Sequence, residues 1–374
     1  MASLARRNLF HDKVRLMVTL TGVVFAVVLV SIQLGLFFGF KTATSNIIDH
    51  SGADLWLTGK DVTYIENGVR FSERKLYQVL ATPGVAAASK YIVDFSQWKM
   101  PGGAEEGILL VGFDPATNFG GPWDIVAGRV ENLKAADTVI VDELYRDKLG
   151  IARLGQTVEI QGRRARVVGF TRGIRTFTTS PAVFTSFKNA QNYTRLREDE
   201  TMYILVRAVA GVDVEALRSE LVARVRGVEV YTNAEFSRRT QNYWMFGTGA
   251  GVTVLIAAAL GLIVGIVVVA QTIYAATVDH LREFGTLKAM GASNGYIYRV
   301  IIKQALMSAV IGYVLGMSIS LPASFFSQQG TTAIILPWPV VLGLFGLTIL
   351  MCITASVISI NKVTRIDPAL VFKG

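Results

Sequence analysis

The sequence predicts an α-helical membrane protein with four transmembrane helices and a large α/β extracytoplasmic domain between helices 1 and 2. Four long apolar runs contain no Asp, Glu, Lys, Arg or His. The mixed polar residues 41–246 separate the first run from the other three. Lysine and arginine are enriched before the first run, between the second and third runs, and after the fourth run. Together these patterns indicate one span, an outer domain and three further spans.

The expected spans are residues 16–40, 247–277, 304–326 and 334–360. The first has 25 residues without a charge, and at about 1.5 Å per residue it exceeds a hydrocarbon core of roughly 30 Å. A cleaved signal peptide is the alternative, but its apolar region is usually about 7–15 residues, so an uncleaved helix is favoured. The uncharged loop Ser327–Pro339 predicts a tight hairpin of spans three and four, with little exposed outside the membrane.

The basic residues predict the orientation. The segments 1–15 (an amphipathic helix), 278–303 and 361–374 (the tail) contain eleven Lys or Arg against four Asp or Glu, which is +7 of the net +9. The positive-inside rule places these segments in the cytoplasm, with both termini, in a multi-pass protein of the bacterial inner (plasma) membrane. Residues 41–246 are then periplasmic. Contact with anionic membrane lipid explains the basic balance, so no nucleic-acid partner is expected.

The outer domain has the mixed pattern of an α/β fold. Short strands are expected at Ala53–Leu57, Asp61–Ile65 and Gly107–Phe113, and a hairpin around Gln161–Arg163. Apolar spacing predicts a helix over Val214–Arg226. A polar helix starting at Asn233 is expected to continue into the second span as a stalk.

Catalytic patterns are scarce. The three histidines have no metal-ligand spacing, the single cysteine (Cys352) can form neither an intramolecular disulfide nor a cysteine cluster, and no G-x-S-x-G elbow occurs. No catalytic, metal or cofactor site is therefore predicted in this chain. The spans lack the buried charges that mark ion-coupled carriers. Tryptophans such as Trp123 and Trp244 are interpreted as core or interfacial anchors.

Glycines spaced four residues apart predict close helix packing in the spans. The pairs are Gly35 and Gly39, Gly261 and Gly265, and Gly312 and Gly316.

The sharpest local signal lies in the segment between spans two and three. Leu281, Phe284, Leu287 and Lys288 fall at i, i+3, i+6 and i+7, and Gly291 is a plausible helix stop. A short amphipathic helix fits this spacing. Periodicity alone leaves two interpretations open, a helix that docks on a partner and an interfacial helix that lies on lipid.

The run Arg282–Ser293 (R-E-F-G-T-L-K-A-M-G-A-S) resembles the R-x-x-E-[IF]-G-x-x-[KR]-A-[LMI]-G-A signature of one family of ABC-transporter permeases. This is the type VII family of macrolide exporters, lipoprotein-release permeases and cell-division permeases. The one-plus-three span layout and the Asp367–Leu370 ending agree with it. The run Ser31–Gly35 is similar to permeases of heterocyst-glycolipid-type exporters. Since no G-x-x-x-x-G-K-[ST] occurs, and Asp54 stands where its first glycine would precede Gly59-Lys60, ATP and Mg are expected on a separate subunit.

The resemblance implies a permease that pairs with a second copy of itself or a related chain, and that docks residues 281–291 on an ABC ATP-binding subunit. Phe284, Leu287 and Met290 would anchor the segment, and charged residues would set its register. The implied coupling residues are Leu281, Arg282, Glu283, Phe284, Gly285, Leu287, Lys288, Met290 and Gly291. Such a permease transmits ATPase motion to its outer domain.

That motion would export a lipid or amphiphile through a periplasmic adaptor and an outer-membrane channel. The alternative is a non-transporting relay that controls a periplasmic cell-wall hydrolase. A sensor or a membrane-anchored enzyme is less favoured, because no kinase, cyclase or DNA-binding domain follows the fourth span.

Overall fold

The computed structural model describes residues 13–178, 180–279 and 293–363, which form two compact units. The membrane unit holds the described residues up to Phe38, Val252–Ser327 and those from Ala333 onward. The extracytoplasmic unit holds Gly39–Gly251 and also the short loop Gln328–Thr332. The large α/β domain between the first and second spans is thus confirmed.

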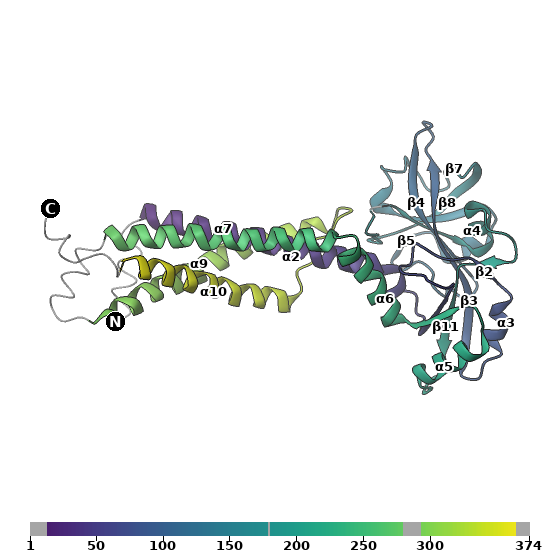
Figure 1. The fold of residues 1–374 in the computed structure, drawn as a ribbon. Coiled ribbons are helices and arrows are strands. Elements are labelled where there is room, and N and C mark those ends of the chain that lie inside the picture. The colour runs from purple at the N-terminus through teal and green to yellow at the C-terminus, as the bar shows by residue number, and fades with distance from the viewer. Residues whose placement is uncertain (1–12, 179, 280–292, 364–374) are drawn as a thin grey trace. The chain divides into compact units, whose positions relative to one another are not determined.

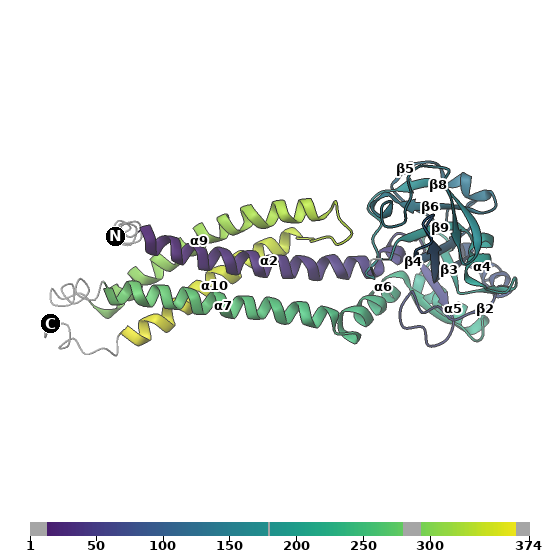
Figure 2. The same cartoon turned by 90° about the horizontal axis from the view of Figure 1, so that it is seen from above.

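Within the described ranges, four helices are long and apolar enough to cross a membrane (Figures 1 and 2). They are α2 (Lys13–Asp49), α7 (Ala250–Asp279), α9 (Asn294–Ser327) and α10 (Trp338–Val363). Helix α2 continues without a break beyond the predicted end of the first span at Phe40, into the extracytoplasmic unit. The four predicted spans are therefore present, with longer helices at several ends.

Helix α10 begins at Trp338, later than the predicted start of the fourth span at Ile334. Pro337 is the reason, because a proline disfavours the helical conformation of the residue before it. The stretch Ile334–Leu336 lies outside any helix or strand, and the amide of Ile335 donates to the carbonyl of Gly35 at 2.9 Å. A Cβ on Gly35 would meet Ile334 and Leu336 of this stretch.

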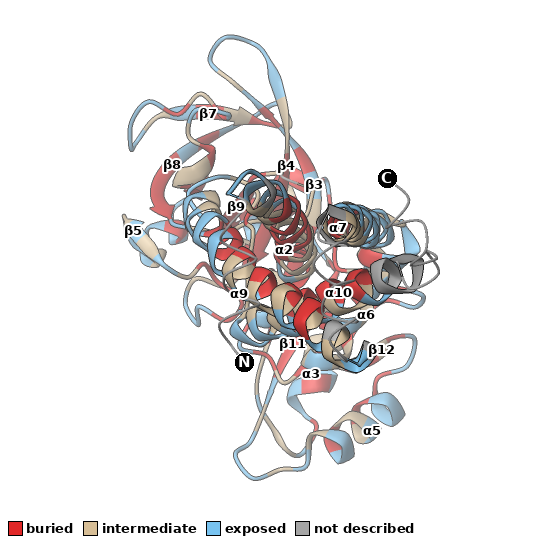
Figure 3. Cartoon of the chain, turned by 90° about the vertical axis from the view of Figure 1, so that its left-hand side faces the viewer, coloured by how far each residue is buried: buried red, intermediate tan, exposed pale blue. Residues whose placement is uncertain are grey.

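The membrane unit packs around α2. Its buried cluster includes Val23 and Val27 of α2 and Ala305 and Ala309 of α9, and Figure 3 shows buried residues along α2, α9 and α10. Inside the unit, Ser31 Oγ of α2 lies 2.6 Å from Ser320 Oγ of α9. Each hydroxyl also lies within hydrogen-bond distance of a carbonyl of its own helix, so one serine donates to that carbonyl while the other donates to its partner serine. This pair is an interhelical hydrogen bond of the kind that holds spans together.

The described extracytoplasmic residues build one ten-stranded sheet, ordered β12-β1-β11-β3-β4-β9-β6-β8-β5, with β7 pairing with β3 and β8. Strand β3 is shared by two lobes, since residues up to Tyr91 pair with β11 and residues from Ile92 pair with β4. A separate two-stranded sheet joins β2 to β10. The strands are β1 (Leu55–Thr58), β2 (Phe71–Ser72), β3 (Val85–Lys99), β4 (Glu105–Phe113), β5 (Ile125–Ala127), β6 (Thr138–Asp142), β7 (Thr157–Ile160), β8 (Arg163–Thr171), β9 (Ala182–Ser186), β10 (Glu200–Thr201), β11 (Tyr203–Ala208) and β12 (Glu229–Thr232).

Both faces of the first lobe's sheet are buried, which explains the apolar run in β1. Leu55 and Leu57 belong to one cluster, which includes residues of α3 and α5. Trp56 points to the opposite face, where its ring meets Tyr203 and Phe236 of α6 edge-on or tilted, at centroid distances of 5.6 and 5.3 Å. Alternate residues of a strand point to opposite faces, so one strand serves two cores.

The helices of the extracytoplasmic unit begin at recognisable caps. Thr232 Oγ1 accepts from the amide of Glu235 at 3.2 Å, and the Thr-x-x-Glu spacing is that of a capping box. Asp213 and Ser186 cap two other helices in the same way. The helices are α3 (Lys75–Leu80), α4 (Phe187–Thr194), α5 (Val214–Arg224) and α6 (Asn233–Asn242), with short 3-10 turns η1 (Val130–Lys134) and η2 (Glu143–Tyr145).

Two local predictions were wrong. Asp61–Ile65 is not a strand, because Asp61 adopts a positive φ of 62° and turns the chain, while Val62 and Ile65 enter the core from a loop. The stalk is not continuous either. Helix α6 passes into a π-helical turn, η3 (Tyr243–Gly247), and the helix then breaks at Gly249, whose φ is +79°. A left-handed residue cannot continue an α-helix, so α7 starts afresh at Ala250.

Candidate functional site

The residues predicted to couple to an ATPase, Leu281–Gly291, lie outside the described residues. The structure does place the two helices that flank them, since α7 ends at Asp279 and α9 begins at Asn294. The coupling role of the segment stays a prediction. Three features of the described residues are candidates. They are a groove in the extracytoplasmic unit, the buried carboxyl of Glu66 in the same unit, and the contacts of the packing glycines in the membrane unit.

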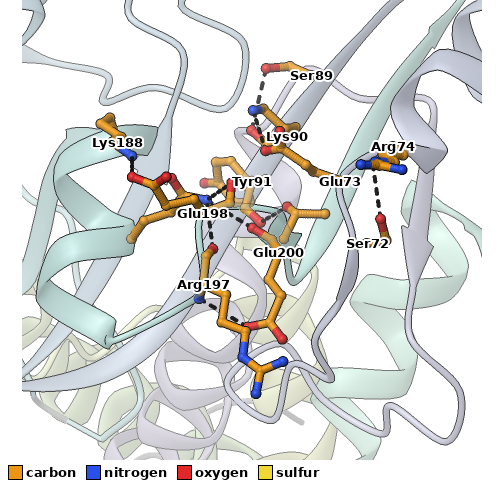
Figure 4. A network of polar contacts seen from close by, with 12 residues as sticks. Ser72, Glu73, Arg74, Ser89, Lys90, Tyr91, Lys188, Arg197, Glu198 and Glu200 are labelled. Atoms are coloured by element: carbon orange, nitrogen blue, oxygen red, sulfur yellow. Dashed lines mark hydrogen bonds and ion pairs between the residues drawn. The ribbon is translucent and has the colours of Figure 1, made fainter.

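A groove of about 630 Å³ opens where the two lobes meet along β3. Lys90 of β3 reaches Glu73 at 2.6 Å (Figure 4). The Lys90 ammonium also lies 4.5 Å from the centroid of the Phe187 ring of α4. On the other wall, Lys188 reaches Glu198 at 2.8 Å. The hydrogen bond from Lys188 lowers the pKa of Glu198. Both of these lysines are thus neutralised within the groove.

The side-chain amide of Gln191 holds one wall of the groove in place. Gln191 Nε2 donates to the carbonyls of Arg197, Glu198 and Glu200 at 3.2, 3.2 and 3.1 Å. Because Gln191 is buried, it holds this turn against α4. Charges of both signs line the groove, without a nucleophile beside a base. It is suited to binding a polar surface and offers no arrangement for covalent chemistry.

A buried carboxyl lies beside the π-helical turn. Glu66 is 8% exposed, and Trp244 Nε1 donates to its Oε2 at 3.2 Å. Burial raises the pKa of Glu66 to about 7, although the Trp244 hydrogen bond opposes that shift. Tyr64 stacks on Tyr243 with ring centroids 3.9 Å apart, and Phe177 packs on Trp244 at 5.0 Å. The turn is therefore fixed to the domain by aromatic contacts around a titratable group.

The sequence did not single out Glu66, because a glutamate in a polar stretch before Asn67-Gly68 has no pattern that signals burial. Trp244 was interpreted only as an anchor, and it also donates to a carboxylate. His50, which could have suggested a general base, stacks on Trp123 at 4.2 Å, and its Nδ1 lies 2.9 Å from the carbonyl of Asn46. In the described part of the chain no group of three or more His, Cys, Asp or Glu could hold a metal.

Four of the six predicted packing glycines lie against α2. A Cβ added to Gly261 would come 2.7 Å from Leu29 Cδ2, and one on Gly316 would come 2.6 Å from Val27 Cγ1. Gly312 faces Val23 at similar range, and Gly265 faces Ala26 as well as Met351 of α10. The glycines therefore let α7 and α9 approach α2 closely. Gly39 of α2 is buried as well.

Comparison with protein families gives two successive matches. The MacB-like periplasmic core domain matches residues 16–224, and the FtsX-like permease C-terminal domain matches residues 255–368. The first match alone spans more than half of the chain.

The similar full-length proteins include ABC transporter permeases. An uncharacterized ABC transporter permease of Mycobacterium tuberculosis is 25% identical over 381 residues, covering 99% of both chains. The macrolide export ATP-binding/permease protein MacB of Escherichia coli is 24% identical over 251 residues, which cover 64% of this chain and 39% of that one.

Among solved structures, the periplasmic region of MacB from Actinobacillus actinomycetemcomitans aligns with a TM-score of 0.41 and 11% identity, covering 53% of this chain and 98% of that one. The extracellular domain of the ABC-type transporter YknZ from Gram-positive bacteria aligns at 0.38 and 15% identity, covering 48% and 99%.

Proposed function

Because this chain belongs to the MacB/FtsX-like type VII family of ABC transporter permeases, we propose that it is the non-catalytic membrane subunit of an ATP-driven exporter of lipid or amphiphilic cargo. The observation that carries the proposal is the signature run Arg282–Ser293, which lies between the second and third spans in a chain similar to ABC permeases along its whole length.

ATP and Mg are bound by a separate subunit in this proposal. The proposal follows from the family resemblance and from the 374 residues, which contain no G-x-x-x-x-G-K-[ST] run. The amphipathic segment around Phe284 and Leu287 docks on the ATPase, with Arg282, Glu283 and Lys288 setting its register. This docking requires the segment, and with it both termini, to face the cytoplasm, as the basic residues predict.

The cargo class follows from what the spans and the outer domain offer. The four predicted spans contain no Asp, Glu, Lys, Arg or His, so no charged side chain in them marks a polar route or an ion-coupling site. The charged groove at the lobe boundary opens outside the membrane unit and suits a partner with a polar surface. We propose that a periplasmic adaptor, which leads to an outer-membrane channel, docks in that groove. The cargo is then taken up at the membrane surface. Two copies of the chain act together.

The test is the ATPase rate of the candidate ATP-binding subunit, co-purified in lipid with this chain. Phe284→Asp and Leu287→Asp are compared with wild type and with the matched control Thr286→Asp, which lies on the same segment but off the apolar stripe. We expect the first two variants to lose both binding and stimulation, and the control to retain them. Full binding and stimulation by a folded Phe284→Asp variant would show that the segment only lies on lipid.

The alternative, a relay that controls a cell-wall hydrolase, shares this ATPase coupling. Transfer of a fluorescent phospholipid out of the reconstituted membrane separates the two functions. An exporter gives ATP-dependent transfer that Phe284→Asp abolishes. Stimulated ATP hydrolysis without transfer of any lipid or amphiphile tested would favour the relay.

A further inference from the structure

One short segment, Gly173–Phe177, contacts every extracytoplasmic connection of the four spans. Asn46 of α2 donates to the carbonyl of Arg175 at 3.3 Å, and Phe40 of α2 packs edge-on against Phe177 at 5.4 Å. Phe177 also packs on Trp244 of the turn that leads to α7. Arg175 reaches the loop Gln328–Thr332, which joins α9 to α10. We call Gly173–Phe177 the junction segment.

Arg175 holds that loop through main-chain carbonyls. Its Nε donates to the carbonyl of Gly330 at 2.9 Å and its Nη2 to that of Gln328, while Nη1 donates to Gly173 at 3.3 Å. Gln328 directly follows the last residue of α9, Ser327. Carbonyls at a helix C-terminus lack partners within the helix and carry partial negative charge, so a guanidinium there is favourable. The planar fork of arginine reaches several acceptors at once, which a lysine cannot.

The junction segment is itself firmly attached to the second lobe. The buried carboxylate of Asp142, at the end of β6, accepts from the amide of Ile174 at 2.7 Å and from Thr171 Oγ1 at 3.0 Å. Ile174 is fully buried, and Thr176 Oγ1 donates to the carbonyl of Ser180 at 2.6 Å. A displacement of the sheet that contains β6 and β8 therefore carries the backbone of Arg175 with it.

We propose that Arg175 is a positioning residue that ties the loop Gln328–Thr332 to the extracytoplasmic domain, so that α9 and α10 follow this domain during the ATPase cycle together with α2 and α7. The inference rests on the proposed function, because it concerns the transmission of ATP-driven motion. It adds a third attachment to the two helices that lead directly into the domain. The sequence had predicted only a tight uncharged hairpin at this loop.

The first test measures the loop itself. A spin label is placed at exposed Gln329, between the two acceptor residues, by Gln329→Cys in a Cys352→Ala background, using the full chain in lipid nanodiscs. Losing hydrogen bonds from a charged donor costs about 1.5 kcal/mol or more, so Arg175→Ala should lower the ratio of immobile to mobile label about tenfold. Arg175→Lys should lie between. The control Arg172→Ala removes a neighbouring exposed arginine that pairs with half-buried Glu143, and should leave the label immobile.

The second test measures coupling in the complex with the ATPase subunit. Arg175→Ala should retain ATPase binding but lose most ATP-dependent lipid transfer, and Arg172→Ala should retain both. An immobile label in Arg175→Ala would overturn the attachment. A mobile label with full transfer would overturn the coupling role alone. A wild-type complex that neither stimulates ATP hydrolysis nor transfers lipid would overturn the proposed function and the coupling role with it, while the attachment is judged from the label.

Discussion

The buried carboxyl of Glu66 makes the stability of the extracytoplasmic unit depend on pH. Its pKa is raised from 4.5 to about 7, chiefly by burial. Below pH 4.5 the group is protonated in both the folded and the unfolded chain. As the pH rises towards 7, the unfolded chain releases its proton first, so the free energy of unfolding falls, and it levels off once the folded group has ionised.

The size of the effect follows from the shift. Each pKa unit corresponds to about 1.4 kcal/mol, so the folded state loses about 3 kcal/mol between pH 4.5 and pH 8 through this one group. Glu66→Gln removes the ionisation and keeps an oxygen that accepts from Trp244 Nε1. The variant should therefore match wild type near pH 4.5 and exceed it at pH 8. For a unit of this size the gain corresponds to about 6–12 °C in unfolding temperature.

The assay is thermal unfolding of the full chain in nanodiscs at pH 5 and pH 8, followed by tryptophan fluorescence. Glu131→Gln serves as the control, because Glu131 is an exposed glutamate of the same unit and its loss should not change the pH dependence. Trp244→Phe, which removes the hydrogen bond that opposes the shift, should steepen the pH dependence of wild type. Equal pH dependence in Glu66→Gln and wild type would refute the reasoning.

Two further predictions concern packing and the junction segment. Gly312→Val places a branched side chain against Val23 and should destabilise the membrane unit by about 1–3 kcal/mol. The control Gly343→Ala, which has open space around its added Cβ, should be nearly neutral. Thermal unfolding in nanodiscs measures both variants. Asp142→Ala leaves the amide of buried Ile174 without its acceptor and should lower the free energy of unfolding by about 1–3 kcal/mol. Amide hydrogen exchange at residues 172–176 should become faster. Unchanged exchange there would contradict the role given to Asp142.

The sequence predicted those parts of the fold that follow from local pattern. The spans could be predicted because a charge-free apolar run of this length is seldom anything other than a transmembrane helix. The strand Gly107–Phe113 was readable because its β-rich apolar run ends at Asp114-Pro115. The helix start at Asn233 was visible in polar residues that follow a strand, and the structure adds the Thr232 cap. The broken stalk was not predicted, because a glycine in a polar-to-apolar transition does not reveal its φ.

The candidate sites were much less predictable. Arg175 contacts carbonyls more than 150 residues away, and no spacing rule links a loop arginine to main-chain acceptors in a distant hairpin. Glu66 acquires its pKa only when Trp244 and the surrounding aromatic rings close over it. The predicted coupling residues, such as Phe284, came from a short motif and an amphipathic stripe. A short motif of this kind can be recognised in the sequence because its residues are close together along the chain.

The break at Gly249 gives the two helices that enter the extracytoplasmic domain different tolerance to insertion. One residue added to α2 near Gly39 would rotate everything beyond it by about 100°, since an α-helix has 3.6 residues per turn. The same addition between Thr248 and Gly249 would be absorbed by a turn that is already non-helical. Length variation among related chains should accordingly be confined to the α6–α7 connection. That connection is also the natural position for inserting a reporter domain without changing the helical phase of either neighbour.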